Sequence, residues 1–232
     1  TWAAVSLADK ADTLAGMFVA GERPTGSRDP FGIRRAAQGL VRVLADLPDL
    51  TGVDRGVAIE TLTDRALEAF AGREGVDEAR AALATFLRER VASVFEQRGA
   101  DVRNVRAVMG GLGASTPLTV RRRLDVLPEV TGTREFTALT QLFKRVRNIA
   151  KQLPEADFRT LELAGGALTA LTVPAELTLA AEIDRRRPVI ESAAAAGDYR
   201  KAFSEAAAFA PGVTQFFDDV MVMADEPALR EA

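Results

Sequence analysis

The stretch FTALTQLFKRVRNIAKQ, residues 136–152, decides the fold class of this chain. Its apolar side chains recur at positions 136, 139, 142/143, 146 and 149/150, which is the 3.6-residue period of an α-helix with one apolar face. No stretch of the chain alternates apolar and polar residues convincingly with the period of two that is typical of a half-buried strand. The sequence therefore predicts an all-α protein.

Similar helical patterns cover nearly the whole chain, with glycine and proline residues between them. We predict helices at about residues 1–20, 30–47, 52–71, 74–98, 101–112, 117–128, 133–152, 175–196, 199–210 and 212–224. Asp29-Pro30 is typical of a helix start and Pro48 of a helix end, while Gly197-Asp198 is typical of a stop followed by a new N-cap. The helical pattern is weakest between Pro154 and Pro174.

Joints rich in proline and glycine near residues 48–52 and 110–117 suggest three modules. These are an N-terminal helical part at 1–50, a helical linker at 51–115 and a C-terminal helix bundle at 116–232. The first helix has no N-terminal cap, so we expect Thr1 to lie inside a longer chain.

The composition excludes several kinds of chemistry. The 232 residues include 47% apolar and 27% charged side chains with a net charge of −3, which is typical of a soluble globular protein and not of a generally basic nucleic-acid binder. The absence of cysteine and histidine excludes disulfides, thiolate catalysis, Ser-His-Asp catalysis and sites with Cys or His ligands. No apolar run approaches the roughly 20 residues of a membrane span. We expect an intracellular segment without catalytic residues, bound metal or membrane.

One loop has the glycine spacing of a phosphate-binding loop. Gly21 and Gly26 have the G-x-x-x-x-G spacing, but Ser27-Arg28 stands where Lys-Ser/Thr is needed to contact phosphates and Mg²⁺. The preceding segment is also predicted to be a helix, whereas a nucleotide loop follows a buried strand. The sequence favours a turn between two helices.

Two basic helix faces are the candidate binding surfaces. Arg34, Gln38 and Arg42 share one face of the helix predicted at 30–47, opposite an apolar face that includes Phe31, and Arg28 and Arg35 flank them. The second face lies on the helix at 133–152. Such faces can be simply solvated, form ion pairs between domains or bind RNA phosphates. The candidate nucleic-acid-binding residues are Arg28, Arg34, Arg35, Arg42, Lys144, Arg145, Arg147, Asn148 and Lys151.

Other charged and aromatic groups favour structural roles. Asp9 and Asp12 lie on one helix face, where pairing with nearby cations is favoured over metal binding. The arginine runs 121–123 and 185–187 are more typical of solvated helix faces than of partner sites. The core is the favoured place for the apolar residues of FFDDVMVMA, which are Phe216, Phe217, Val220 and Met223.

Three segments resemble the C-terminal part of the beta subunit of bacterial heterotetrameric glycyl-tRNA synthetase. They are VSLADKADTLAGMFVAGERPTGSRDPFGIRRAAQGLVRVL (5–44), FKRVRNI (143–149) and GDYRKAFSEAAAFAPGVTQFFDDVMVMADEPALR (197–230), and together they extend over essentially the whole chain. Departures from the family pattern are mild, at Ala11, Gly32 and Arg28.

The resemblance implies an ATP-using enzyme with two alpha and two beta subunits, in which the alpha subunit holds the catalytic site and uses ATP and Mg²⁺. This chain would comprise the end of an HD-like module, a linker and a helical anticodon-binding domain, and would bind glycine tRNA in the cytoplasm without a cofactor of its own. Asp9 stands where HD phosphohydrolases place their last metal-binding aspartate. Two alternatives remain: a phosphohydrolase remnant and a non-catalytic scaffold for subunit assembly.

Overall fold

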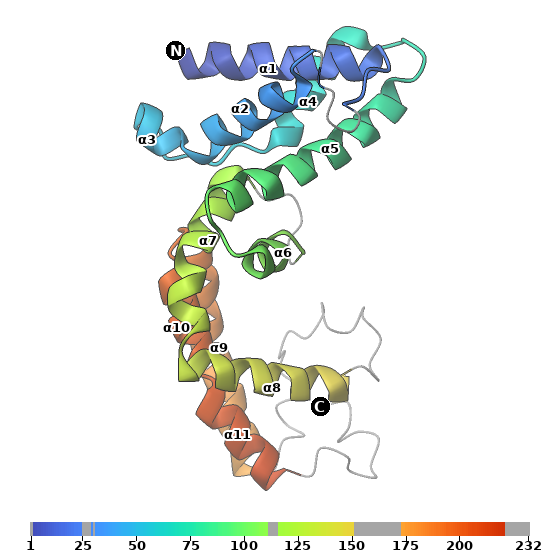
Figure 1. Cartoon of the computed structure of the whole chain (residues 1–232). Helices are drawn as coiled ribbons and strands as arrows, with labels where there is room; N and C mark the ends of the chain where they lie inside the picture. The colour runs from blue at the N-terminus through green and yellow to red at the C-terminus, as the bar shows by residue number, and fades with distance from the viewer. Residues whose placement is uncertain (1, 25–28, 30, 111–115, 151–172, 221–232) are drawn as a thin grey trace. The chain divides into compact units, whose positions relative to one another are not determined.

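The protein is helical throughout the part that the structure describes, which confirms the predicted all-α class (Figure 1). The computed structural model describes residues 2–24, 29, 31–110, 116–150 and 173–220. Its helices are α1 (Trp2–Val19), α2 (Ile33–Ala45), α3 (Leu47–Thr51), α4 (Ile59–Leu67), a 3₁₀ turn η1 (Glu68–Phe70), α5 (Val76–Gln97), α6 (Val102–Gly110), α7 (Pro117–Thr131), α8 (Arg134–Ala150), α9 (Pro174–Ala195), α10 (Tyr199–Ala207) and α11 (Ala210–Asp219).

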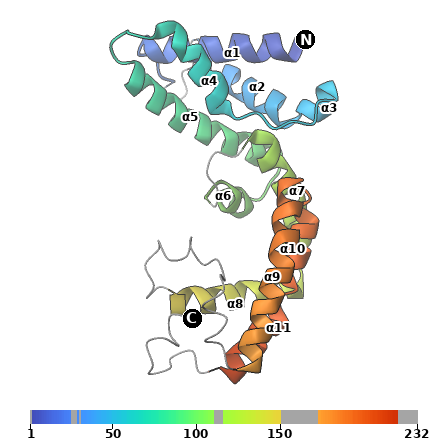
Figure 2. The same ribbon diagram turned by 180° about the vertical axis from the view of Figure 1, so that it is seen from behind.

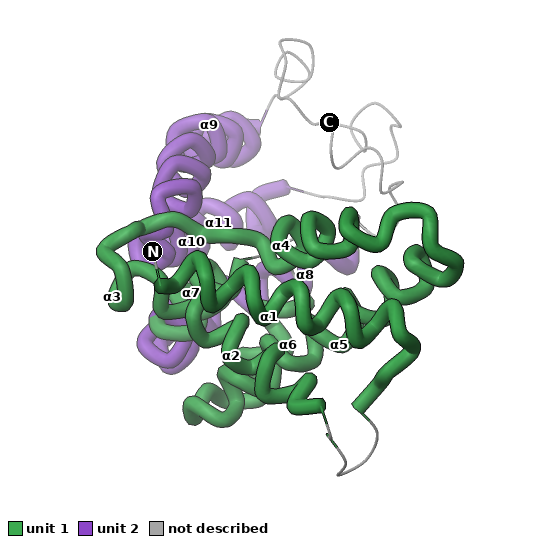
Figure 3. Tube along the Cα trace, turned by 90° about the horizontal axis from the view of Figure 1, so that it is seen from above, with its two compact units in different colours: residues 1–125 green, residues 126–232 purple. Residues whose placement is uncertain are grey.

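The chain forms two compact units (Figure 3). Unit 1 comprises Thr1–Asp125 and unit 2 comprises Val126–Ala232. Helix α7 crosses the boundary and so contributes residues to both. The division into modules at 1–50, 51–115 and 116–232 stays a prediction.

The core of unit 1 lies where α1, α2, α4 and α5 pack together (Figures 1 and 2). Helix α2 buries one face because its apolar residues follow the helical period, as the sequence predicts. Phe31, which precedes this helix, is an exception because its side chain is exposed. The most deeply buried large side chains of α1 and α2 are Leu14, Phe18, Ile33, Leu40, Val41 and Leu44.

Two helix boundaries, near residues 30 and 48, differ from the prediction. Helix α2 begins at Ile33, after Gly32 with φ of 66°, and not at Pro30. Asp29 nevertheless supports the start of the helix, because its Oδ2 accepts a hydrogen bond from the backbone N–H of Arg34 at 3.1 Å. Pro48 does not end a long helix but lies at the start of the short helix α3.

The helix predicted from residue 52 begins only at Ile59. A Cβ atom on Gly56 would lie 2.6 Å from Oγ1 of Thr116, so the chain passes Thr116 where only glycine fits.

Unit 2 is built around α9, which packs against α10 and α11, while α8 packs against the same two helices. Asp198 caps α10 as predicted, since its side chain accepts a hydrogen bond from the N–H of Lys201 at 3.1 Å. Among the described residues of this unit, the buried side chains are mostly small, and they are Leu127, Ala175, Ala180, Ala193 and Tyr199. The three buried alanines all lie on α9, the helix around which the unit is built.

None of the helices in the described ranges combines the length and the apolar character that crossing a membrane requires.

Candidate nucleic-acid interface

Helix α8 carries the main candidate surface, and its first turn is fixed to the rest of unit 2. Oγ1 of Thr133 accepts a hydrogen bond from the N–H of Phe136 at 3.1 Å, which caps the helix. The ring of Phe136 meets the ring of Phe203 on α10 edge to face, with centroids 6.4 Å apart and planes at 72°. The N-terminal half of α8 is thus anchored to α10.

The C-terminal half of α8 is exposed over the whole run from Phe143 to Asn148. Within this run lie the predicted residues Lys144, Arg145, Arg147 and Asn148, while Lys151 lies outside the described residues. At 100° per residue, Lys144, Arg147 and Asn148 occupy neighbouring positions around the helix. The structure therefore brings these polar side chains together on one exposed surface, here called the α8 basic face (Lys144, Arg145, Arg147 and Asn148).

Arg145 is held by a contact from another helix. Its guanidinium carbon lies 4.0 Å from the centroid of the Phe217 ring on α11, which is a cation–π contact. Phe217 in turn meets Phe216 edge to face, with centroids 5.5 Å apart. Both rings are half-buried, so the core position predicted for them is reached only in part, and Met223 lies outside the described residues.

The apolar stripe of α8 is not buried along its full length. Phe136, Leu139 and Leu142 are half-buried, as a face turned towards neighbouring helices requires. Phe143 and Val146 are 63% and 43% exposed. The sequence suggests a packing role for Phe143, and reasoning from periodicity misses an aromatic ring exposed among cations. Its position beside Lys144 and four residues before Arg147 is the signal that could have indicated it.

The second predicted basic face lies on α2, in unit 1. Arg35 and Arg42 are exposed and Arg34 is half-buried. The Nη2 atom of Arg42 donates to Oε1 of Gln97 at 3.5 Å, and the side chain of Arg35 folds back over Gly32. Arg28 lies outside the described residues. The predicted binding residues therefore form two groups, one in each compact unit.

The two arginine runs form ion pairs inside the protein. Arg121 pairs with Asp46 and Asp49, and Arg122 pairs with Asp54. The hydrogen bond that Arg121 donates to the Asp49 carboxylate is the main cause that raises the pKa of Arg121 above its usual value. These side chains attach the start of α7 to the segment that follows α2.

The run at 185–187 makes comparable pairs in unit 2. Arg185 and Arg186 both bind Glu182 on the same helix, and Nη1 of Arg186 also lies 2.7 Å from Oε2 of Glu205 on α10. Ion pairing therefore explains much of both runs without a partner molecule.

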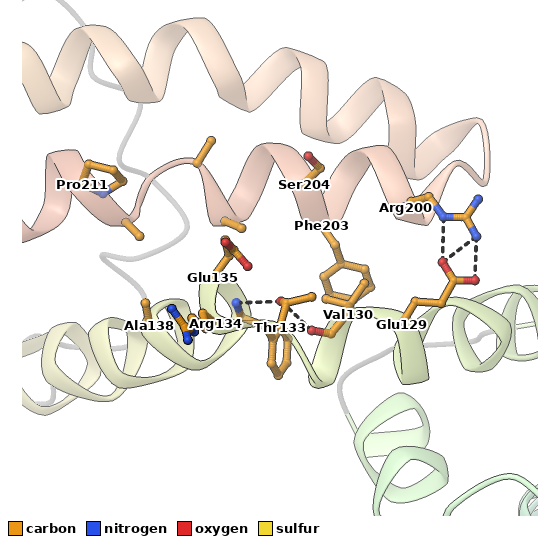
Figure 4. Close-up of a pocket in the computed structure, with 14 residues that line it drawn as sticks. Glu129, Val130, Thr133, Arg134, Glu135, Ala138, Arg200, Phe203, Ser204 and Pro211 are labelled. Atoms are coloured by element: carbon orange, nitrogen blue, oxygen red, sulfur yellow. Dashed lines mark hydrogen bonds and ion pairs between the residues drawn. The ribbon is translucent and has the colours of Figure 1, made fainter.

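A pocket of about 730 Å³ lies between the end of α7, the start of α8, α10 and the start of α11 (Figure 4). At one end Arg200 makes a two-pronged ion pair with Glu129, with Nη2 to Oε2 at 2.7 Å and Nε to Oε2 at 2.9 Å. Apolar groups including Val130, Phe136, Phe203 and several alanines line much of the remainder. Arg200 and Glu129 pair with each other, and Arg134 and Glu135 also line the pocket with opposite charges, so the lining has no net charge that would favour an anion.

The sequence motifs with the spacing of nucleotide and metal sites lie on α1 and in the segment that follows it. Gly21 follows the end of α1 with φ of 81°, as expected for a helix stop, whereas residues 25–28 of the loop lie outside the described residues. Asp9 and Asp12 are exposed on α1. Within the described residues, no group of three or more Asp or Glu side chains is arranged to hold a metal ion.

Comparison with known proteins gives the family. The family model of the glycyl-tRNA synthetase beta subunit matches residues 1–110. A glycine–tRNA ligase beta subunit from Acinetobacter baumannii is 34% identical over 231 residues, covering 99% of this chain and 32% of the relative. Those from Dechloromonas aromatica and Anaeromyxobacter dehalogenans are both 35% identical, covering 97% and 98% of this chain and 30% and 31% of the relatives.

The chain thus spans about a third of the length of the curated relatives that it matches. The family model covers most of unit 1, and the alignment with the Acinetobacter relative, at 34% identity overall, extends over nearly the whole chain. Together these matches support a fragment of a glycyl-tRNA synthetase beta subunit.

Proposed function

We propose that this chain is a tRNA-binding region of a glycine–tRNA ligase, and that it positions glycine tRNA for ATP-dependent aminoacylation by the alpha subunit. The observation that carries the proposal is the α8 basic face, where cations and an amide are exposed together on one helix. The names of the relatives, which are glycine–tRNA ligase beta subunits, supply the class of partner.

The chemistry of the α8 basic face suits the RNA backbone. Lys144 and Arg147 present positive charge to phosphate oxygens, and Asn148 has both a donor and an acceptor for a base edge or a sugar hydroxyl. The net charge of −3 for the whole chain keeps this attraction local, because only the exposed basic faces draw a polyanion. The α2 residues Arg34, Arg35 and Arg42 are proposed as a second set of phosphate contacts, together with Arg28.

The proposed contribution to the reaction is positioning. Binding energy from phosphate contacts fixes the orientation of the tRNA, and an oriented acceptor end reacts as though it were present at a much higher concentration. ATP and Mg²⁺ would be used at the alpha subunit, so the residues of this chain hold neither and perform no bond-making step. The assembly would contain two alpha and two beta subunits and would act in the cytoplasm.

Salt-dependent binding tests the proposal. We expect the 232-residue chain to bind glycine tRNA more tightly than an unrelated tRNA, with an affinity that falls as salt rises. Each of Lys144→Gln and Arg147→Gln should lower the slope of log affinity against log salt by about 0.7 to 0.9, because each removes one phosphate contact. Filter binding at several salt concentrations measures both quantities, and Arg185→Gln, on an arginine paired with Glu182, is the matched control.

An affinity for glycine tRNA that ignores salt, or that equals the affinity for unrelated tRNA, would contradict the proposal. If charge reversal at Arg145 and Arg147 leaves tRNA binding intact while the chain still binds the alpha subunit, the scaffold alternative replaces it.

A further inference from the structure

We infer that Phe143 is a base-stacking residue and that the α8 basic face therefore binds RNA at an unpaired nucleotide. The inference rests on the proposed function and adds to it the kind of RNA structure that this surface recognises. It also adds a residue that the charge pattern alone does not indicate.

The ring of Phe143 is exposed to solvent. At 63%, Phe143 is the most exposed phenylalanine among the large apolar side chains that the described part of the chain leaves uncovered. Leaving an aromatic ring in water forgoes the free energy that burial would provide. Phe136, about two turns earlier on the same helix, packs against Phe203 and shows what a structural phenylalanine does in α8.

The ring of Phe143 lies beside the cations of the α8 basic face. Phe143 and Arg147 are four residues apart and are neighbours on the helix surface, and Lys144 follows directly in sequence. Val146 extends the apolar patch on the side away from the cations and is 43% exposed. The surface thus places a flat apolar ring at the edge of a positively charged strip.

Single-stranded RNA is the partner that fits both the cations and the exposed ring. A single RNA strand offers phosphates at regular spacing and bases whose faces stack on aromatic rings, and proteins that bind such strands combine cations with exposed aromatics. A paired duplex offers the phosphates but keeps its bases stacked inside the helix, so it would use the cations and leave Phe143 idle. An acidic peptide would likewise need only the cations. The ring therefore favours unpaired RNA.

The experiment measures binding of a short single-stranded RNA that contains 2-aminopurine, and of the same sequence in a duplex, to the 232-residue chain. We expect Phe143→Leu to weaken binding of the single strand by about fivefold or more and to remove the quenching of 2-aminopurine fluorescence that stacking causes. Duplex affinity and the salt slope should not change, because leucine removes the ring and no charge. Phe143→Trp should preserve both the affinity and the quenching.

Trp2→Ala is the matched control, since it removes an exposed aromatic side chain, 54% exposed, from α1 in the other unit. The inference fails if Phe143→Leu binds the single strand within about twofold of the unaltered chain, or if it weakens the duplex equally. Should Arg147→Gln still weaken tRNA binding in that case, the proposed function stands without the stacking residue. If Lys144→Gln and Arg147→Gln leave tRNA binding unchanged, the proposed function fails as well. Competition by polyglutamate that is as strong as competition by RNA, and independent of Phe143, would assign the surface to an acidic peptide and overturn the inference.

Discussion

Asp46 and Arg121 join the start of α7 to the end of α2, with Nη1 of Arg121 lying 3.0 Å from Oδ1 of Asp46. The same carboxylate accepts two hydrogen bonds from Arg98 at the end of α5, at 2.9 and 2.6 Å. One half-buried aspartate thus connects three helices of unit 1, because α2 ends at its position and the two arginines come from α5 and α7.

We predict that Asp46→Asn destabilises unit 1. An amide keeps the shape of the side chain but removes the charge that Arg98 binds, while Arg121 keeps Asp49 and Asp125, so the loss should be about 1 kcal/mol for a partly exposed network. Urea unfolding followed by the fluorescence of Trp2, the one tryptophan of the chain, reports on α1 and hence on unit 1. Asp12→Asn, on an exposed aspartate of α1, is the control and should change little. Equal stability of Asp46→Asn and the unaltered chain would show that the connection contributes nothing.

This connection shows where reasoning from the sequence stops. Periodicity predicts the helices and the buried face of α2, because both depend on residues within a few positions of each other. It does not predict that Arg121 pairs with residues 72 and 75 positions away, and the run at 121–123 therefore resembles a solvated face. The exposure of Phe143 is missed for the same reason, since whether a helical stripe is covered depends on neighbours that are distant in sequence.

Glycine and proline residues predict only some of the helix boundaries correctly. Gly197-Asp198 predicts its stop and cap correctly because the capping bond links residues three positions apart. Asp29-Pro30 places the start of α2 too early, because Asp29 accepts its bond from Arg34, five residues further on. At Gly56 the chain passes close to Thr116, a contact that no local pattern reveals.

We predict that Leu14→Ala destabilises unit 1 by about 2 to 5 kcal/mol. Leu14 is fully buried in α1, so truncation removes its burial and leaves a cavity among the packed helices. Unfolding in urea, again followed by Trp2 fluorescence, measures the loss. Val5→Ala on the exposed side of the same helix should change the free energy of unfolding by less than about 0.5 kcal/mol. A similar effect of both variants would show that the burial of Leu14 is not what stabilises the helix.

We predict that the effect of Gly39→Ala depends on Lys10. A Cβ atom at position 39 would lie 2.7 Å from Cε of Lys10, whose Nζ donates to Oγ of Ser6 at 2.9 Å. Alanine should favour the helical state of α2 by about 1 kcal/mol, but Lys10 must move and lose that hydrogen bond. The single variant should therefore be close to neutral, whereas Gly39→Ala combined with Lys10→Ala should show the full gain relative to Lys10→Ala alone. A double-mutant cycle from urea unfolding measures the coupling, and additive effects would show that α1 and α2 are not in tight contact at this point.

We predict that unit 2 loses stability at acid pH because of Glu182 on α9. Hydrogen bonds from Arg186 and then Arg185 lower the pKa of Glu182 below its usual value. A carboxyl group whose pKa is lower in the folded state than in the unfolded state stabilises the folded protein above the unfolded pKa. That stabilisation is lost as the pH falls through the folded pKa, because between the two pKa values the unfolded state binds more protons than the folded state. The loss should therefore occur below about pH 4.5, the usual value for glutamate.

Glu182→Gln should lower the melting temperature at pH 7 and lose this difference from the unaltered chain as the pH falls below that value. Circular dichroism melts between neutral and acid pH measure the change, and Tyr199, the one tyrosine of the chain and buried at the start of α10, provides a local absorbance probe for unit 2. Glu191→Gln, on an exposed carboxylate of the same helix, controls for removing a negative charge. Arg186 also binds Glu205 on α10, so Glu182→Gln leaves the link between α9 and α10 in place and the unit folded. A difference between Glu182→Gln and the unaltered chain that persists unchanged into strong acid would contradict the prediction, because it could not arise from the charge of Glu182.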